Sequence, residues 1–127
     1  MGFLSALMGN ASQVDVSELN EELSPILANN ENVELGFKLI RDKFVFTNKR
    51  LILIDKQGIT GSKVEYHSVP YKAITHFKIE SAGHFDMDSD LKIYISGSDA
   101  PISRELRSGD DIVAIQKTLA NCIFGQD

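Results

Sequence analysis

The chain has 127 residues, of which 43% are hydrophobic and 24% charged, and this length and composition are typical of one globular domain with one core. The net charge of −5 argues against a nucleic-acid-binding protein, which would need a surplus of Lys and Arg on one face. The first nine residues carry no base, no apolar run approaches the roughly 20 residues of a membrane-spanning helix, and one cysteine forms no internal disulfide, so we expect a cytoplasmic protein.

Residues 1–30 are expected to form an acidic helical arm. The first 33 residues hold five acids and no base, whereas the remaining 13 acids and 13 bases cancel. Apolar residues recur at helical spacing in two groups, which predicts two short helices. These residues are Leu4, Leu7, Met8, Val16, Leu19, Leu23 and Leu27. Asp15 and Glu18 suggest a capping box for the second helix, and Pro25 should end or kink it.

Residues 31–127 are expected to form the body of the domain. The apolar residues Val33, Leu35, Phe37 and Leu39 alternate with others, which is the period of a half-buried strand. Turn residues delimit further runs, and we expect strands at about 43–48, 50–56, 63–69, 73–81, 90–97 and 101–107. Seven short strands without an intervening helix favour an antiparallel meander in a sandwich or partly opened barrel.

A single helix is predicted to close the chain. After Ser108 and Gly109, four residues share one helical stripe, and they are Ile112, Ile115, Leu119 and Cys122. An amphipathic helix at this place could plug the open end of a small rolled sheet.

Three segments together resemble the bacterial pleckstrin-homology (PH) domain family. They are Phe44–Asp55 (FVFTNKRLILID), Val69–Tyr71 (VPY) and Ala82–Asp88 (AGHFDMD). The resemblance implies a mainly β, PH-like roll of seven antiparallel strands capped by a C-terminal α-helix. It also implies subunits that assemble into closed rings, with five subunits as one arrangement, and it carries over no catalytic residue. Eukaryotic PH domains usually have a tryptophan in the last helix, whereas this chain has none, so phosphoinositide binding does not follow from the fold.

The first hairpin is the candidate anion- or lipid-binding site. Between residues 38 and 50 the local charge is +4, from Lys38, Arg41, Lys43, Lys49 and Arg50 against one acid. Such bases suit the head groups of anionic lipids. The same charges also protect sheet edges from unwanted pairing when they are solvated at the ends of a hairpin.

The run Leu51, Ile52, Leu53 and Ile54 is apolar on both faces of its strand. A single sheet layer with its core on one side should present polar residues on the other. Something must therefore cover the outer face: the helical arm, another subunit, or both. We take these four residues as the candidate oligomer interface.

We expect no metal site, cofactor or catalytic centre. Asp86, Asp88 and Asp90 alternate as in a calcium loop, but Leu91 stands where that loop needs glycine and Gly97 where it needs glutamate. A solvated acidic loop, or a contact with bases of a neighbouring subunit, fits this segment better. The three histidines are scattered along the chain without the spacing of a known catalytic motif.

The sequence thus predicts a non-enzymatic, PH-like protein-interaction scaffold that assembles with itself, with a further protein partner of unknown identity. The alternative is a peripheral module that binds anionic lipid or phosphoinositide at a membrane surface. Nucleic acid is not an expected partner.

Overall fold

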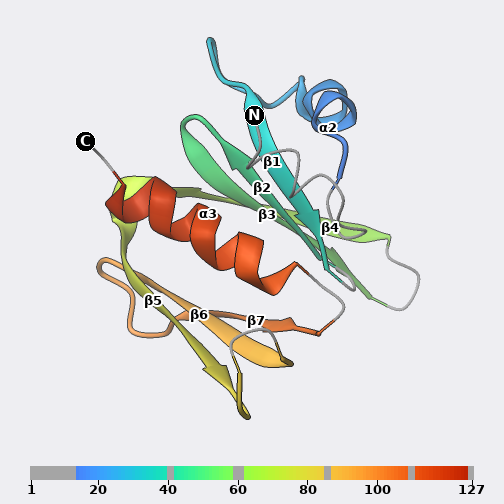
Figure 1. Ribbon diagram of the computed structural model, residues 1–127. Helices are drawn as coiled ribbons and strands as arrows, with labels where there is room; N and C mark the ends of the chain where they lie inside the picture. The colour runs from blue at the N-terminus through green and yellow to red at the C-terminus, as the bar shows by residue number, and fades with distance from the viewer. Residues whose placement is uncertain (1–13, 40–41, 59–61, 85–86, 109–110, 126–127) are drawn as a thin grey trace. The chain divides into compact units, whose positions relative to one another are not determined.

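The computed structural model describes residues 14–39, 42–58, 62–84, 87–108 and 111–125 (Figure 1). Its elements belong to two compact units, the first ending at Val69 and the second beginning at Pro70. The described residues contain seven antiparallel strands and a C-terminal helix, as the sequence predicts.

The first unit contains one helix and a four-stranded sheet in the order β1-β2-β3-β4. Its elements are α2 (Val16–Leu23), β1 (Val33–Lys38), β2 (Asp42–Thr47), β3 (Arg50–Gln57) and β4 (Lys63–Pro70). Each strand starts and ends within one or two residues of its predicted bounds. The first helix that the sequence predicts lies outside the described residues.

Pairing across β2 and β3 shows how the apolar run of β3 is divided between two faces. Val45 is opposite Ile52, whereas Phe44 is opposite Leu53. Successive residues of a strand point to opposite faces, so Ile52 and Ile54 share one face and Leu51 and Leu53 the other. Both faces of β3 are therefore apolar and buried.

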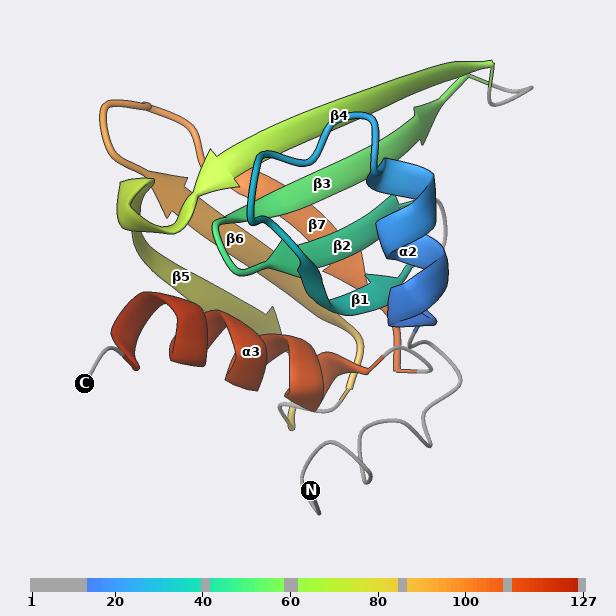
Figure 2. The ribbon, with the colours of Figure 1, turned by 90° about the horizontal axis from the view of Figure 1, so that it is seen from above.

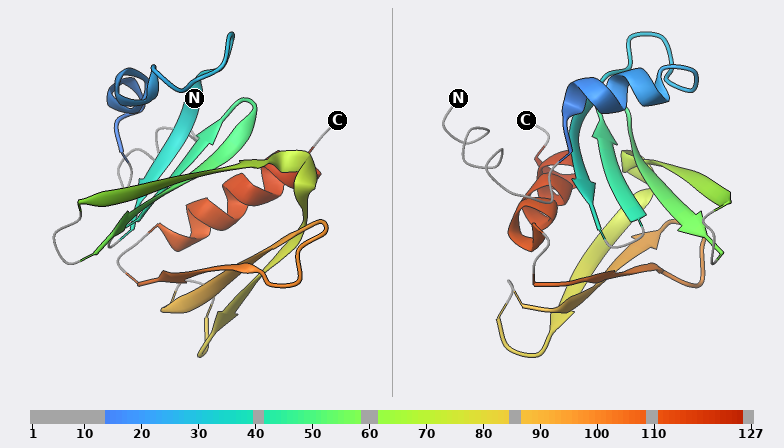
Figure 3. Two further views of the ribbon diagram at one scale, coloured as in Figure 1. Left: turned by 180° about the vertical axis from the view of Figure 1, so that it is seen from behind. Right: turned by 90° about the vertical axis from the view of Figure 1, so that its right-hand side faces the viewer.

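Helix α2 covers the face that carries Ile52 and Ile54 (Figure 2). Its N-cap is Asp15, whose carboxylate accepts a hydrogen bond from the Ser17 backbone N–H at 2.8 Å. The buried cluster beneath the helix consists of Leu19, Leu23, Val33, Val45, Ile52 and Ile54. The predicted arm is thus the cover of this face within the single chain, and two views of the same ribbon show α2 lying across the sheet (Figure 3).

An ion pair fastens Glu31, which directly follows the arm, to the β2–β3 hairpin. The guanidinium of Arg50 donates two hydrogen bonds to the buried Glu31 carboxylate, from Nε to Oε2 at 2.8 Å and from Nη2 to Oε1 at 3.1 Å. Glu31 also accepts hydrogen bonds from the Thr47 hydroxyl and the Ala28 backbone N–H, both at 2.7 Å. The carboxylate is therefore fully hydrogen-bonded where it is buried.

This environment changes the acidity of Glu31. Burial alone would raise the pKa of the carboxyl, but the hydrogen bonds from Arg50, Ala28 and Thr47 and the charge of Arg50 outweigh burial and lower the pKa from 4.5 to about 2. Glu31 therefore stays ionised throughout the neutral and mildly acidic range.

The second unit contains a three-stranded sheet in the order β5-β6-β7. Its elements are the short 3-10 helix η1 (Tyr71–Ala73), β5 (Ile74–Ser81), β6 (Ser89–Ile95), β7 (Ile102–Leu106) and α3 (Ile112–Phe124). Helix α3 lies against η1. The predicted stripe residues Ile112, Ile115 and Leu119 are buried, whereas Cys122 is half-buried. None of the described helices has the length and hydropathy needed to cross a membrane.

We predict that Gly36→Ala loosens the arm. A Cβ at Gly36 would overlap the Leu19 side chain, and overpacking of this kind costs about 1–3 kcal/mol. The free energy of unfolding from urea denaturation should fall accordingly, and α2 should become sensitive to limited proteolysis. Gly83→Ala is the matched control, because its Cβ would meet its nearest neighbour, the Met87 sulfur, at 3.5 Å. Equal stability of the two variants would contradict the packing argument.

We predict that Glu31→Gln removes an acid-sensitive part of the stability. Because the folded pKa of about 2 lies below the unfolded value of 4.5, ionised Glu31 stabilises the fold above pH 4.5 and loses this effect as the pH falls toward 2. The loss amounts to up to about 3 kcal/mol. Urea unfolding at pH 7, 4.5 and 3 should show this decline in the parent chain and a smaller one in the variant. Glu34→Gln, on an exposed position of β1, should keep the parent's pH dependence; a parental decline in Glu31→Gln would sink the prediction.

Candidate interaction sites

The basic residues of the first hairpin separate into two groups at opposite ends of the sheet. Lys38 and Lys43 are opposite each other on β1 and β2, whereas Lys49 and Arg50 lie beyond the other end of β2. Six strand residues separate the groups by roughly 20 Å. Arg41 lies outside the described residues. The four described bases therefore do not surround one ligand.

Two of these bases are already engaged within the chain. Besides Glu31, Arg50 donates hydrogen bonds to the Ser68 hydroxyl and the Ile26 carbonyl, both at 2.7 Å. Lys43 lies 3.6 Å from the Glu22 carboxylate. Within the described part of the chain, Lys38 and Lys49 have no ion pair, so they are the bases of this set with a free charge.

The structure adds Lys56 to the first group. A hollow of about 240 Å³ is lined by Glu22, Lys38, Leu39, Asp42, Lys43, Ile54, Lys56, Val64 and Tyr66. Three lysines against two acids leave a formal excess of one positive charge. Sequence reasoning missed Lys56 because it lies in the next strand, although its even spacing from Ile52 and Ile54 on β3 places it on the same face.

Among the described strands, β4 lies at one edge of its sheet, and its side chains are almost all exposed. Only Val69 is buried among its eight residues. The large apolar side chains of Val64 and Tyr66 are 37% and 51% exposed. Exposed apolar residues on an unpaired strand edge are a recognised site of strand addition.

The other edge of this sheet is partly occupied by the arm. The Val14 backbone N–H donates a hydrogen bond to the Gly36 carbonyl of β1 at 3.0 Å. This bond uses an acceptor that would otherwise face an incoming strand. Strand β4 is therefore the more accessible of the two edges.

The predicted interface residues Leu51, Ile52, Leu53 and Ile54 are buried inside the chain, with exposures between 0% and 4%. Ile52 and Ile54 lie beneath α2. Contact of these side chains with a second copy would require the residues that cover them to move. An exposed surface such as that of β4 can contact a second copy without such a rearrangement.

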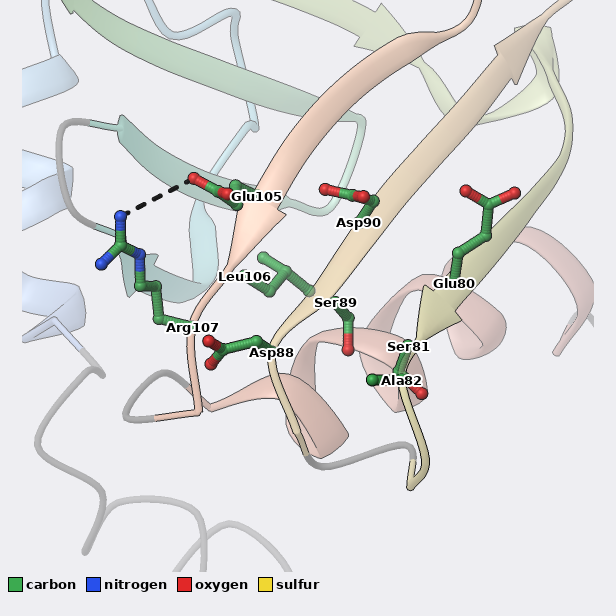
Figure 4. A pocket seen from close by; sticks show the side chains of 9 residues that line it. All are labelled: Glu80, Ser81, Ala82, Asp88, Ser89, Asp90, Glu105, Leu106 and Arg107. Atoms are coloured by element: carbon green, nitrogen blue, oxygen red, sulfur yellow. Dashed lines mark ion pairs between the residues drawn. The ribbon is translucent and has the colours of Figure 1, made fainter.

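A row of carboxylates crosses the second sheet (Figure 4). Glu80 on β5 is opposite Asp90 on β6, and Asp90 is opposite Glu105 on β7. Together with Asp88 and Arg107 they line a pocket of about 310 Å³. Sequence reasoning singled out Asp88 and Asp90, but it could not find Glu80 and Glu105, because only strand register brings them together.

The carboxylates of this row differ in whether a basic side chain lies near enough to balance their negative charge. Glu80 lies 3.2 Å from both Lys78 and Lys92, and the hydrogen bonds from these lysines lower the pKa of its carboxyl. Glu105 lies 3.8 Å from Arg107, and both side chains are exposed. In the described part of the chain, Asp90 has no basic partner within ion-pair distance.

The acidic segment that contains Asp86, Asp88 and Asp90 lies partly outside the described residues. Asp86 lies outside the described residues. The Asp88 carboxylate accepts a hydrogen bond from the Ser108 backbone N–H at 2.7 Å. Among the described residues, no group of three or more His, Cys, Asp or Glu side chains is placed to hold a metal ion.

Two solved structures of high sequence identity have the same fold. A pleckstrin homology domain from Shewanella amazonensis SB2B is 62% identical, with a TM-score of 0.85 over 97% of this chain and 99% of that one. A DUF1696 family protein with a pleckstrin-homology domain from Shewanella loihica PV-4 is 61% identical, with a TM-score of 0.77 over 91% of this chain and 98% of that one. The predicted PH-like fold is thus confirmed.

One sequence relative covers nearly the whole chain, and a second covers just over half of it. The uncharacterized protein YjqA of Bacillus subtilis (strain 168) is 54% identical over 121 residues, which cover 94% of this chain and 97% of YjqA. The uncharacterized protein YozO of the same organism is 39% identical over 56% of this chain and 61% of its own length. These relatives indicate no enzymatic family. Residues 2–123 match the profile of the bacterial PH domain, and the chain belongs to this family.

Proposed function

We propose that this bacterial PH domain is a non-enzymatic interaction scaffold that assembles with copies of itself, and that the contact is made along the edge of β4. The observation that carries the proposal is the exposed β4 edge, with Val64 and Tyr66 on its surface. Adding a strand satisfies the backbone groups of such an edge and buries its apolar side chains in one step.

The arrangement of the first unit supports this choice of surface. Its sheet face is closed by α2, and the β1 edge is partly occupied through Val14. A contact between β4 and a different surface of the next copy would be heterologous, and heterologous contacts close into rings when the rotation permits. The ring that the sequence analysis expected would arise in this way.

We predict that the parent chain has a solution mass that is a multiple of the monomer mass in size-exclusion chromatography with light scattering. The double variant Val64→Asp, Tyr66→Asp should shift the mass toward the monomer, because two charges would replace buried apolar contacts. Its thermal midpoint should change little, since both side chains are exposed in the single chain.

Val113→Asp is the matched control, because Val113 is an exposed valine on α3. It should leave the oligomer intact. A monomeric parent chain at all concentrations tested would overturn the proposal.

A second candidate function is binding of anionic lipid at the hollow lined by Lys38, Lys43 and Lys56. The observation that favours it is the convergence of lysines from three strands beside the exposed Tyr66. Basic groups near an anionic surface contribute about 1 kcal/mol each. Glu22 and Asp42 on the same rim oppose this attraction.

For the lipid candidate, we predict salt-sensitive sedimentation with vesicles of phosphatidylcholine and phosphatidylglycerol, and none with phosphatidylcholine alone. Lys38→Glu together with Lys56→Glu should lower the bound fraction on the order of tenfold or more at low salt. Lys49→Glu, an exposed lysine at the other end of the sheet, should have a smaller effect. Absence of binding by the parent chain would dismiss lipid as a ligand of this hollow.

A further inference from the structure

We infer that β4 of one copy pairs antiparallel with β7 of a second copy, so that the lysine hollow of the first copy meets the carboxylate row of the second. The inference rests on the proposed self-assembly and names its two surfaces. The hollow contains Lys38, Lys43 and Lys56, and the row contains Glu80, Asp90 and Glu105.

Strand β7 is an edge of its sheet. In the described part of the chain it is paired with β6 alone, and the side chains of Ser103 and Glu105 are exposed. Strands β4 and β7 thus offer an edge from the first sheet and an edge from the second. Pairing of two different edges gives a head-to-tail contact.

Charge selects β7 as the partner strand. Like charges directly opposite each other in a sheet are destabilising, and the row contains two such pairs, Glu80 with Asp90 and Asp90 with Glu105. Lysines compensate Glu80 from within its own sheet. Glu105 has the exposed Arg107 at 3.8 Å, a long and solvated contact, so both Asp90 and Glu105 can gain a counter-charge from a neighbouring copy.

The spacing of a sheet allows this compensation. Adjacent strands lie about 4.8 Å apart, so a residue on an added strand and one on β3 would be about 10 Å apart across β4. The side chains of lysine and glutamate together can span that distance. We therefore expect an ion pair between Lys56 of one copy and Glu105 of the next. Its two side chains would meet beside Val64 of the first copy, which lines the same hollow as Lys56.

The antiparallel direction follows from the position of the hollow. Val64 lies near the start of β4 and lines the hollow, and an antiparallel β7 would set its end, with Glu105, beside that start. A parallel β7 would instead bring Glu105 toward Ser68, beside Arg50, whose guanidinium is already engaged with Glu31 and Ser68.

A charge exchange tests the pairing. Lys56→Glu and Glu105→Lys should each weaken self-association about tenfold or more, measured as the midpoint of the mass-against-concentration curve in light scattering. Combining the two changes in one chain should restore association to within about threefold of the parent, because the opposite charges then meet again.

Matched controls are Lys49→Glu and Asp99→Lys, which reverse exposed charges away from both surfaces. They should leave the midpoint unchanged. Far-ultraviolet circular dichroism and the thermal midpoint show whether each variant is folded.

Cross-linking tests the direction of the strands. In a Cys122→Ser background, a mixture of Val64→Cys and Glu105→Cys chains should form a disulfide-linked dimer under mild oxidation, whereas Ser68→Cys mixed with Glu105→Cys should not. The reverse pattern would overturn the antiparallel pairing.

The outcomes separate the two proposals. A monomeric parent chain removes the self-assembly proposal and this inference with it. A parent chain that assembles, with single charge reversals that do not weaken it or a double variant that is not restored, overturns the β4–β7 pairing alone.

Discussion

The ion pair between Glu31 and Arg50 is the constraint on which the surface of the first unit depends. It joins the residue that directly follows the arm to the hairpin of β2 and β3, and the arm in turn covers Val45, Ile52 and Ile54. A buried ion pair is not by itself strong evidence for stability, because desolvation offsets much of the attraction. Besides its pH-dependent contribution to stability, this ion pair holds the segment that follows α2 against the hairpin, through Ile26 and Ala28.

The covered face determines where a partner can bind. With α2 in place, the large apolar side chains of this sheet that stay exposed are on β4, and the hollow opens between α2 and that strand. Lys43 and Glu22 pair on its rim, so the arm also reduces the positive charge of the hollow. The β4 edge, the hollow and the arm are therefore parts of one surface, and a change in the position of the arm would alter both the exposed apolar area and the charge of the hollow.

The strands could be predicted from the sequence because alternation of apolar residues, as at Val33, Leu35 and Phe37, reports a local property of the backbone. The partners of the charged residues could not. The sequence makes Arg50 a candidate anion ligand, but in the structure its guanidinium binds the carboxylate of Glu31, 19 residues earlier in the chain. Likewise, the row of Glu80, Asp90 and Glu105 exists only through the register of three strands, and no spacing along the chain reveals it.

The hydrogen bond from Val14 to Gly36 makes the two edges of the first sheet unequal, because it occupies part of the β1 edge. A sheet with two open edges can add strands at both sides without limit, which is the geometry of a cross-β ribbon. Here the segment at Val14 lies against the β1 edge, so the addition of a strand from another molecule at that edge is hindered. Loss of this short contact would therefore matter less for the stability of the fold than for keeping concentrated protein out of open-ended aggregates.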